Sequence, residues 1–464
     1  MGSVEASPHF EVLGDTRPQD TSLPAFMVST TRGFLPRQEP VVRLPQEFDI
    51  LESLLNRMPI KKLDGTPGLL GTFTLGDTVL KELPDLTHAI NKYQHNLPLM
   101  NAVYRDYSFL ASAYLLEPCH ERFLKGEGYG LGRQMLPSVI ALPISRCAEL
   151  AGFKPFMEYA GSYALFNYRL EDPKKGLDYD NLRPIRAFEH GLDAKSSEAG
   201  FVLVHVDMVQ NSGPLVDGVI SSLDACEAKD REAFDAGINK VLEAMMKVNR
   251  VMDGMWAKSR PNDYIAFRTF IFGITSQSMF PHGVIYEGIS EVPLSFRGES
   301  GANDSMIPLC DNFLQISMPD TPLTTILKEF RSYRPGNHRE FLAYVAARAD
   351  RLSLKSYALQ ESSSTALYIL ALDQVRDFRW RHWCFTREYI LKKTNHPVAT
   401  GGSPIVTWLP NQLMAVLDAM DQVWSDSGKE LGNKVGDVME RAVAQRETLA
   451  KEVKKFSEES KPAA

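Results

Sequence analysis

The chain has 464 residues, of which 44% are hydrophobic and 23% charged, as is typical of a folded globular protein. Its formal net charge is −7, and no dense basic stripe occurs, which argues against nucleic acid as the main partner. No run of about eighteen apolar residues predicts a membrane-spanning helix, so we expect no membrane partner.

The compartment is predicted from the cysteines and the N-terminus. Five cysteines form no C-x-x-C pair, and we expect reduced, mostly buried thiols. The first fifteen residues show no basic region followed by an apolar one, so we expect no secretory signal. We therefore expect a cytoplasmic protein, and we expect it to be a monomer.

The first part of the chain divides near residue 46. Residues 1–45 are rich in Pro, Ser and Thr and show little periodicity, so we expect an extended lead-in. Residues 46–150 show helical patterns and are expected to form a small N-terminal helical domain. The expected helices cover residues 47–55, 80–94, 101–116 and 136–150, with Pro98, Pro118 and Pro143 near their ends or at a kink.

Residues 151–464 are expected to form one large helical domain, which makes the whole chain all-α. The apolar run at 200–209 fits either a strand or the start of a buried helix. Residues 275–305 are rich in Gly, Ser and Pro and are expected to form a loop. Helices are expected at 215–256, with a break near 228–230, at 323–332, 338–348, 364–393 and 411–423, and in the charged C-terminal thirty residues.

One histidine lies on the apolar stripe of the expected helix 364–393. From Leu367 to Tyr389, apolar residues and His382 follow one another at steps of three or four, so His382 points where the core residues point. A buried neutral imidazole can bind a metal or haem iron, but it can also be a hydrogen-bonded core residue. Arg379 shares this face and could pair with an acidic cofactor group, with solvent or with an acidic side chain.

Motifs of the common enzyme classes are absent from the sequence. GEGYGLG at 126–132 lacks the spacing of a dinucleotide-binding loop and no strand precedes it, while ATGGSP at 399–404 lacks the lysine of a phosphate loop. There is no H-E-x-x-H motif, no metal-finger spacing of histidines and no G-x-S-x-G elbow.

Several ordered segments resemble the indoleamine 2,3-dioxygenase family over roughly residues 20–425. They include RWRHWCFTREYILKKTNHPVATGGSP, FRGESGANDS, RSYRPGNHREFL, KPFMEYAGSYALFNYRLEDP, GFVLVHVDM and AFRTFIFGITSQSMFPHGVIYEG. The resemblance implies an all-α fold whose large domain holds haem b between helices. It implies insertion of both atoms of O2 across the indole C2–C3 bond of L-tryptophan, giving N-formylkynurenine. That reaction opens the kynurenine pathway, which leads to NAD biosynthesis.

The resemblance also implies roles for particular residues. His382 matches the proximal haem ligand, and Arg379 matches the arginine near the haem and its propionates. Arg268 matches the arginine that holds the substrate carboxylate, and Thr400, in a mobile Thr-Gly-Gly loop, matches the threonine that contacts the amino acid group. Matches to the wall of the substrate pocket are Tyr159, Ser162, Phe201, Tyr264, Ser300 and Gly301, of which Tyr264 is offset by one residue.

His205 departs from the vertebrate pattern, which has a serine or threonine at this position. The related tryptophan 2,3-dioxygenases use a distal histidine that accepts the indole N–H, so we expect His205 to do the same. It could instead be a structural histidine that faces away. The alternative function is a non-catalytic haem protein that carries or senses O2, which would not need Arg268 and Thr400 to hold an amino acid.

Overall fold

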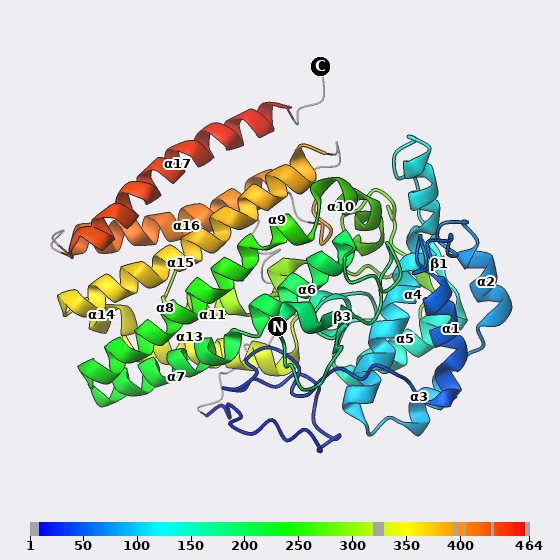
Figure 1. The fold of residues 1–464 in the computed structure, drawn as a ribbon, viewed down its shortest axis with the longest axis horizontal. Coiled ribbons are helices and arrows are strands. Elements are labelled where there is room, and N and C mark those ends of the chain that lie inside the picture. The colour runs from blue at the N-terminus through cyan, green and yellow to red at the C-terminus, as the bar shows by residue number, and fades with distance from the viewer. Residues whose placement is uncertain (1–8, 319–328, 394–397, 403–404, 428–430, 460–464) are drawn as a thin grey trace.

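A computed structural model describes residues 9–318, 329–393, 398–402, 405–427 and 431–459 (Figure 1). The expected all-α fold is confirmed, because helices dominate the described residues and the strands are only two or three residues long. The strands form two small sheets: β1 (Met135–Leu136) pairs in parallel with β4 (Ile285–Tyr286), and β2 (Tyr168–Leu170) pairs antiparallel with β3 (Leu182–Pro184). None of the described helices is long and apolar enough to cross a membrane.

The N-terminal part is built around one long buried helix. Its helices are α1 (Asp49–Arg57), α2 (Leu75–Glu82), α3 (Thr87–Lys92), α4 (Leu97–Leu124) and α5 (Ser138–Ala151). The helix α4 is buried over most of its length, and α1, α2 and α5 pack against it. Pro118 and Pro143 lie inside α4 and α5 rather than at their ends.

The prediction of a single helix at 80–94 is wrong, because this region forms parts of two helices. Helix α2 ends at Glu82 and α3 begins at Thr87. Pro84 has no N–H to donate, and the residue before it, Leu83, takes an extended conformation as residues before proline do. The Asp85 carboxylate accepts a 2.9 Å hydrogen bond from the backbone N–H of Thr87, which starts the next helix.

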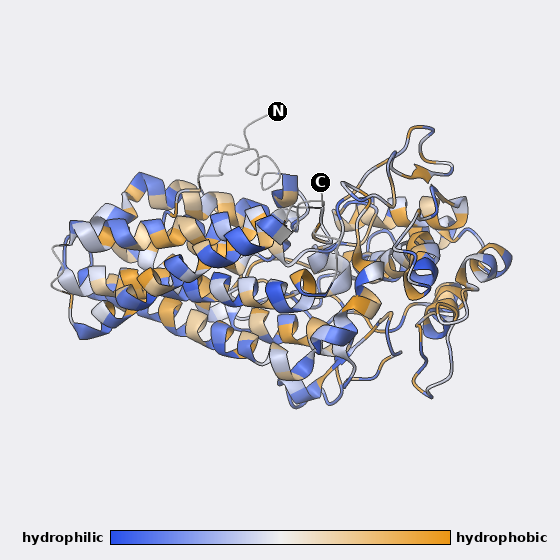
Figure 2. Ribbon diagram, turned by 90° about the horizontal axis from the view of Figure 1, so that it is seen from above, coloured by the Kyte–Doolittle hydropathy of each residue, from blue (hydrophilic) through white to orange (hydrophobic). Residues whose placement is uncertain are grey.

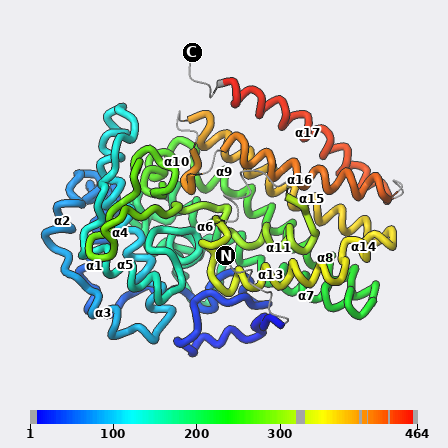
Figure 3. The backbone as a smooth tube through the Cα atoms, turned by 180° about the vertical axis from the view of Figure 1, so that it is seen from behind, coloured from blue at the N-terminus to red at the C-terminus, as the bar shows by residue number. Residues whose placement is uncertain are grey.

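Long helices of the C-terminal part lie side by side (Figures 1 and 3). The helices of this part are α6 (Ser197–Val209), α7 (Ser212–Ala228), α8 (Arg231–Asp253), α9 (Met255–Lys258), α10 (Pro261–Arg268), α11 (Met306–Phe313), α13 (Gly336–Leu352), α14 (Leu354–Ala358), α15 (Ser362–Thr386), α16 (Ile405–Asp426) and α17 (Asn433–Glu459). Packing runs in sequence from α7 to α8, α15, α16 and α17. Polar and apolar residues are interspersed along these helices (Figure 2), and their buried apolar side chains pack against the neighbouring helices.

Several expected helix boundaries are confirmed. The break between α7 and α8 falls at Lys229, which has a φ of 58°, and Asp230 caps the next helix by accepting from the N–H of Ala233. The apolar run at 200–209 is helix and belongs to α6, which Ser196 caps. Of the helix expected at 323–332, residues 323–328 lie outside the described residues.

Two π-helical turns occur near the predicted site, and one of them carries the predicted residues Tyr159 and Ser162. The helix α15 continues into the π-helical turn η6 (Arg387–Leu391), and a second π-helical turn, η2 (Tyr159–Tyr163), follows α5. Such turns insert a residue relative to an α-helix and are frequent at functional sites. They shift the side chains that follow out of the register that a regular helix would give.

The lead-in up to residue 45 contains no helix among its described residues 9–45, yet it packs firmly. Phe26 and Phe34 are buried, and the Phe34 N–H donates to the Ser212 hydroxyl of α7. Buried residues of the lead-in, of α4 and of α15 belong to one continuous apolar cluster. The predicted division at residue 150 stays a prediction.

Candidate functional site

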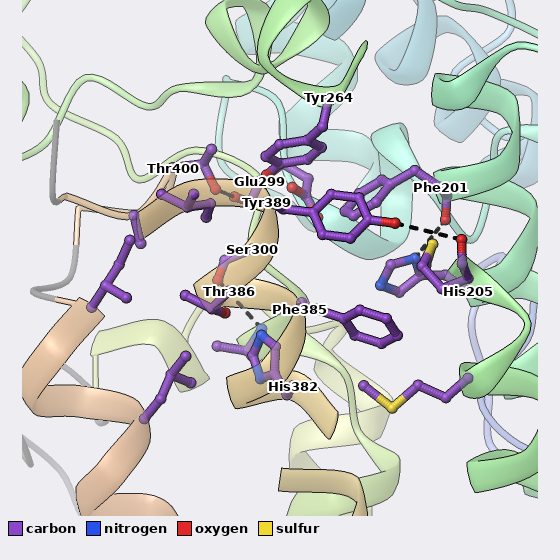
Figure 4. Close-up of a pocket in the computed structure, with 18 of the residues that line it drawn as sticks. Phe201, His205, Tyr264, Glu299, Ser300, His382, Phe385, Thr386, Tyr389 and Thr400 are labelled. Carbon is purple, nitrogen blue, oxygen red and sulfur yellow. Dashed lines mark hydrogen bonds between the residues drawn. The ribbon is translucent and has the colours of Figure 1, made fainter. Parts of the chain in front are cut away.

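Two cavities that share lining residues lie beside His382 on α15, and Figure 4 shows the smaller one. The smaller one, called here the substrate cavity, has a volume of about 150 Å³ and is walled largely by aromatic and methionine side chains. The larger one, called here the cofactor cavity, has a volume of about 620 Å³, within the range of roughly 300–1,000 Å³ usual for ligand pockets. Both are lined by Gly301, Ala302, His382, Trp408 and Leu409.

The His382 imidazole is available as a ligand. No described residue makes a hydrogen bond to its ring. Burial, with a smaller effect from His205, lowers the pKa of His382 to about 4, so the ring is neutral at pH 7 and has a free lone pair. Among the described residues no cluster of three or more His, Cys, Asp or Glu side chains could hold a metal ion. A lone neutral imidazole facing a cavity fits haem iron, which takes one such ligand.

Arg379 faces the cofactor cavity from one turn before His382. Its Nη2 binds both carboxylate oxygens of Asp311, at 2.9 and 2.7 Å, while its buried Nη1 has no partner in the described part of the chain. The side chains of Arg331, Arg334 and Arg339 line the same cavity. Such guanidinium groups suit the acidic edge of a cofactor, because they bind carboxylates in a planar geometry. The residues present therefore fit a haem.

His205 presents an acceptor nitrogen to the substrate cavity. Its Nδ1 lies 2.8 Å from the backbone carbonyl of Phe201, one turn earlier on α6. A carbonyl can only accept, so Nδ1 carries the proton, and burial lowers the pKa of His205, which keeps the ring neutral. The remaining nitrogen, Nε2, points to the backbone at Gly301, where an added Cβ would stand 3.8 Å away. An N–H donor placed in this cavity would find Nε2 as its acceptor.

Aromatic rings form the wall of the substrate cavity on the side away from His382. The ring of Phe201 lies 4.9 Å from that of His205 and 5.5 Å from that of Tyr264, measured between centroids. Tyr389, from the π-helical turn η6, contacts Tyr264 edge-on at 5.6 Å, and its hydroxyl donates to the backbone of Ser259. This wall suits a flat aromatic ligand.

The Thr-Gly-Gly segment lies against the cavity and is anchored there. The backbone of Thr400 accepts from the N–H of Gly273, and that of Gly401 accepts from Arg297. A Cβ on Gly401 would meet the tip of the Phe330 ring at 2.6 Å, so a side chain at this position would require that ring to move. Thr400, Ser300 and Gly301 all line the substrate cavity, as predicted from the sequence.

Three residues predicted for the pocket do not line either cavity. Tyr159 lies behind His205, with ring centroids 5.6 Å apart. The Ser162 hydroxyl donates to the Glu158 carbonyl within its own turn. Arg268 is fully buried; its Nη2 donates to the carbonyl of Val398, and its Nε and Nη1 have no partner among the described residues. The pocket roles of all three stay predictions.

The sequence reasoning missed Glu299. Its side chain lines the substrate cavity beside Tyr264 and Thr400 (Figure 4) and is 3% exposed. The available signal was an acidic residue directly before the predicted pocket residue Ser300, in a segment otherwise rich in small residues. Trp408 of α16, shared by both cavities, was missed as well, because its helix reaches the site from a distant part of the chain.

Comparison with known proteins gives one consistent result. The model of the family described as "Indoleamine 2,3-dioxygenase" matches residues 22–425. Indoleamine 2,3-dioxygenase nanC of Aspergillus nanangensis is 25% identical over 397 residues, which cover 81% of this chain and 88% of that protein. Indoleamine 2,3-dioxygenase 2 of Homo sapiens is 23% identical over 364 residues, covering 71% and 85%.

The match to indoleamine 2,3-dioxygenase 1 of Mus musculus is shorter. It is 26% identical over 217 residues, and it spans 46% of this chain and only 52% of the mouse protein.

Helix α17 lies beyond the residues that the family model matches. It packs on α15 close to His382, where the indole N–H of Trp383 donates a 2.6 Å hydrogen bond to Glu452 of α17.

Proposed function

Since the chain belongs to the indoleamine 2,3-dioxygenase family, we propose that it is a haem-dependent dioxygenase of L-tryptophan. It would hold haem b through His382 and insert both atoms of O2 across the indole C2–C3 bond, giving N-formylkynurenine. We expect this reaction to run in the cytoplasm on a monomeric enzyme, as the first step of the kynurenine route to NAD.

The observation that carries the proposal is the neutral imidazole of His382, which lines both cavities and has no hydrogen-bond partner among the described residues. One cavity has arginines suited to the acidic groups of a cofactor, and the other has an aromatic wall suited to an indole. When bound, haem supplies O2 activation, which none of the side chains of this site provides by itself. His382 would hold the iron, and Arg379, fixed by Asp311, would bind an acidic group at the edge of the macrocycle.

The protein side chains would act mainly by positioning the substrate. His205 Nε2 would accept the indole N–H and fix the orientation of the ring, while Phe201 and Tyr264 pack on its faces. The Thr400 segment covers the cavity, which limits the access of water. We propose that Arg268 binds the substrate carboxylate with the two guanidinium nitrogens that have no partner among the described residues.

The test is a visible absorption spectrum of the purified protein with and without L-tryptophan, followed by product analysis. We expect a Soret band that shifts on adding L-tryptophan, and formation of N-formylkynurenine under O2 with a reductant. A protein that binds haem and O2 but does not shift with L-tryptophan or form this product would be the non-catalytic carrier or sensor. A protein that binds no haem would contradict both functions.

A further inference from the structure

We propose that Glu299 is a specificity-determining residue, which binds the ammonium group of an amine-bearing indole in the substrate cavity. The inference rests on the proposed function, and it assigns the residue that binds the ammonium end of the substrate. The site consists of the Glu299 carboxylate, the aromatic wall and the Thr400 segment.

The Glu299 carboxyl is buried and has no hydrogen-bond partner among the described residues. It is 3% exposed, and no described residue donates a hydrogen bond to it or pairs with it as a cation. Buried carboxylates are nearly always paired or hydrogen-bonded, because an isolated charge loses its hydration. Burial alone raises the pKa of Glu299 to about 8. An ammonium group at hydrogen-bond distance would offset this loss by stabilising the charged form.

Two other buried acids, Glu158 and Glu198, differ from Glu299 because they accept hydrogen bonds from described residues. The Glu158 carboxylate accepts from the backbone N–H groups of Ala160 and Gly161. The Glu198 carboxylate accepts from the backbone of Phe188. Both therefore have donors inside the protein, and neither lines the substrate cavity. Of these three acids only Glu299 lines the substrate cavity, where a ligand can reach its carboxylate with a donor group.

The surroundings of Glu299 favour an ammonium over a metal ion or a water cluster. Its neighbours on the cavity wall are mostly aromatic or aliphatic, and the described residues contain no group of three or more His, Cys, Asp or Glu side chains that could hold a metal ion. The backbone carbonyl of Glu299 accepts a 2.7 Å hydrogen bond from the Thr400 hydroxyl, which fixes the segment that carries the side chain. An indole stacked on Phe201 and Tyr264 would place a flexible aliphatic amine within reach of this carboxylate.

The carboxylate of an amino acid substrate also has a candidate partner near Tyr264, the guanidinium of Arg268. Burial raises the pKa of the Tyr264 phenol; the charge of Arg268 opposes this rise and the charge of Glu299 adds to it, so both groups lie near that side chain. The Arg268 guanidinium and the Glu299 carboxyl form no hydrogen bond with each other. A buried guanidinium and a buried carboxyl that do not pair with each other suit the two ends of a zwitterion.

The experiment compares three ligands on haem-loaded wild type and Glu299→Gln. L-tryptophan carries both charges, tryptamine carries only the ammonium, and indole-3-propionate carries only the carboxylate. Dissociation constants are measured by equilibrium dialysis. We expect Glu299→Gln to weaken binding of L-tryptophan and tryptamine by about 10- to 100-fold, the range for a hydrogen bond to a charged group. Indole-3-propionate should change less than about twofold.

Glu198→Gln is the matched control, because it neutralises a second buried acid of similarly raised pKa that does not line the cavity. It should leave the ratio of the dissociation constants for tryptamine and indole-3-propionate unchanged. If Glu299→Gln leaves that ratio unchanged, or weakens all three ligands equally, Glu299 does not bind the ammonium and the inference is wrong.

The same samples separate this inference from the proposed function. Wild-type turnover of L-tryptophan with an unchanged ligand ratio in Glu299→Gln would overturn only the role of Glu299. A wild type that binds the amines selectively through Glu299 but forms no N-formylkynurenine would overturn the dioxygenase proposal and leave the ammonium site standing.

Discussion

The hydroxyl of Thr400 donates a 2.7 Å hydrogen bond to the backbone carbonyl of Glu299, and both residues line the substrate cavity. This bond joins the Thr-Gly-Gly segment to the segment that carries Ser300 and Gly301, two regions 101 residues apart in the chain. The loop that the sequence suggests as mobile is therefore closed on the site in this structure. Its side chain and its backbone both take part in the closure.

Replacing Thr400 with valine should weaken that closure while preserving the shape of the side chain. A neutral hydrogen bond contributes about 1 kcal/mol, so we expect KM for L-tryptophan to rise about fivefold in Thr400→Val. Thr400→Ser keeps the hydroxyl and should stay within about twofold of the wild type. Steady-state kinetics of the three proteins tests this. Equal KM values for Thr400→Val and the wild type would show that the bond does not hold the substrate.

Arg268→Leu should reduce kcat/KM for L-tryptophan by at least about a hundredfold, because a desolvated charge-assisted pair contributes about 3 kcal/mol. Tryptamine, which lacks a carboxylate, is the matched control and should be affected much less. In the present structure Arg268 donates to Val398, just before the Thr-Gly-Gly segment. A loss of equal size for both substrates would mean that Arg268 only holds this segment and does not bind carboxylate.

His205→Ser should change how the enzyme discriminates between L-tryptophan and 1-methyltryptophan. The methyl group removes the N–H that Nε2 would accept and occupies the space of the imidazole. The wild type should therefore discriminate strongly against it. His205→Ser should reduce this discrimination and keep a lower rate with L-tryptophan. An unchanged ratio of kcat/KM for the two substrates would place His205 away from the indole.

The raised pKa of Glu299 predicts a pH-dependent stability. Burial raises its pKa to about 8 in the folded protein, whereas in the unfolded chain a glutamate titrates near 4.3. Between these two pH values the folded protein keeps a proton on Glu299 that the unfolded chain releases. The contribution of Glu299 to the free energy of unfolding therefore falls progressively as the pH rises from about 4.3 to about 8. Its titratable neighbours are Glu158 and the phenols of Tyr159, Tyr163 and Tyr264, whose pKa values are also raised.

Glu299→Gln removes this dependence. Its Tm should be close to that of the wild type at pH 5 and higher by a few °C at pH 9. Thermal unfolding of the two ligand-free proteins at both pH values gives the difference. A gap of the same size at pH 5 and pH 9 would show that Glu299 titrates normally and has a solvent-accessible or paired carboxylate.

Local sequence patterns were sufficient to predict the features that depend on a single helix. The three- and four-residue spacing around His382 predicts both the helix α15 and the inward direction of the imidazole, and both follow from geometry within a single element. The break near Lys229 is also local, because the residues that end α7 and cap α8 adjoin in the chain.

The remaining features depend on contacts between distant segments. Asp311 and Arg379 are 68 residues apart, and nothing in either local pattern shows that they pair. Glu299 looks like an ordinary loop residue until α10 and the Thr400 segment bury it. The π-helical turn at Tyr159–Tyr163 rotates Ser162 into its own backbone, and no helical periodicity predicts that change.

The most direct test of the account is haem binding by His382→Ala, compared with His205→Ala, which changes the other histidine of the substrate cavity. Both purified proteins are reconstituted with haem b, and bound haem is measured by the Soret band and by pyridine haemochrome content. The account predicts about one haem per chain in the wild type and in His205→Ala, and loss of stable haem in His382→Ala. Full haem content with an unchanged spectrum in His382→Ala would contradict it.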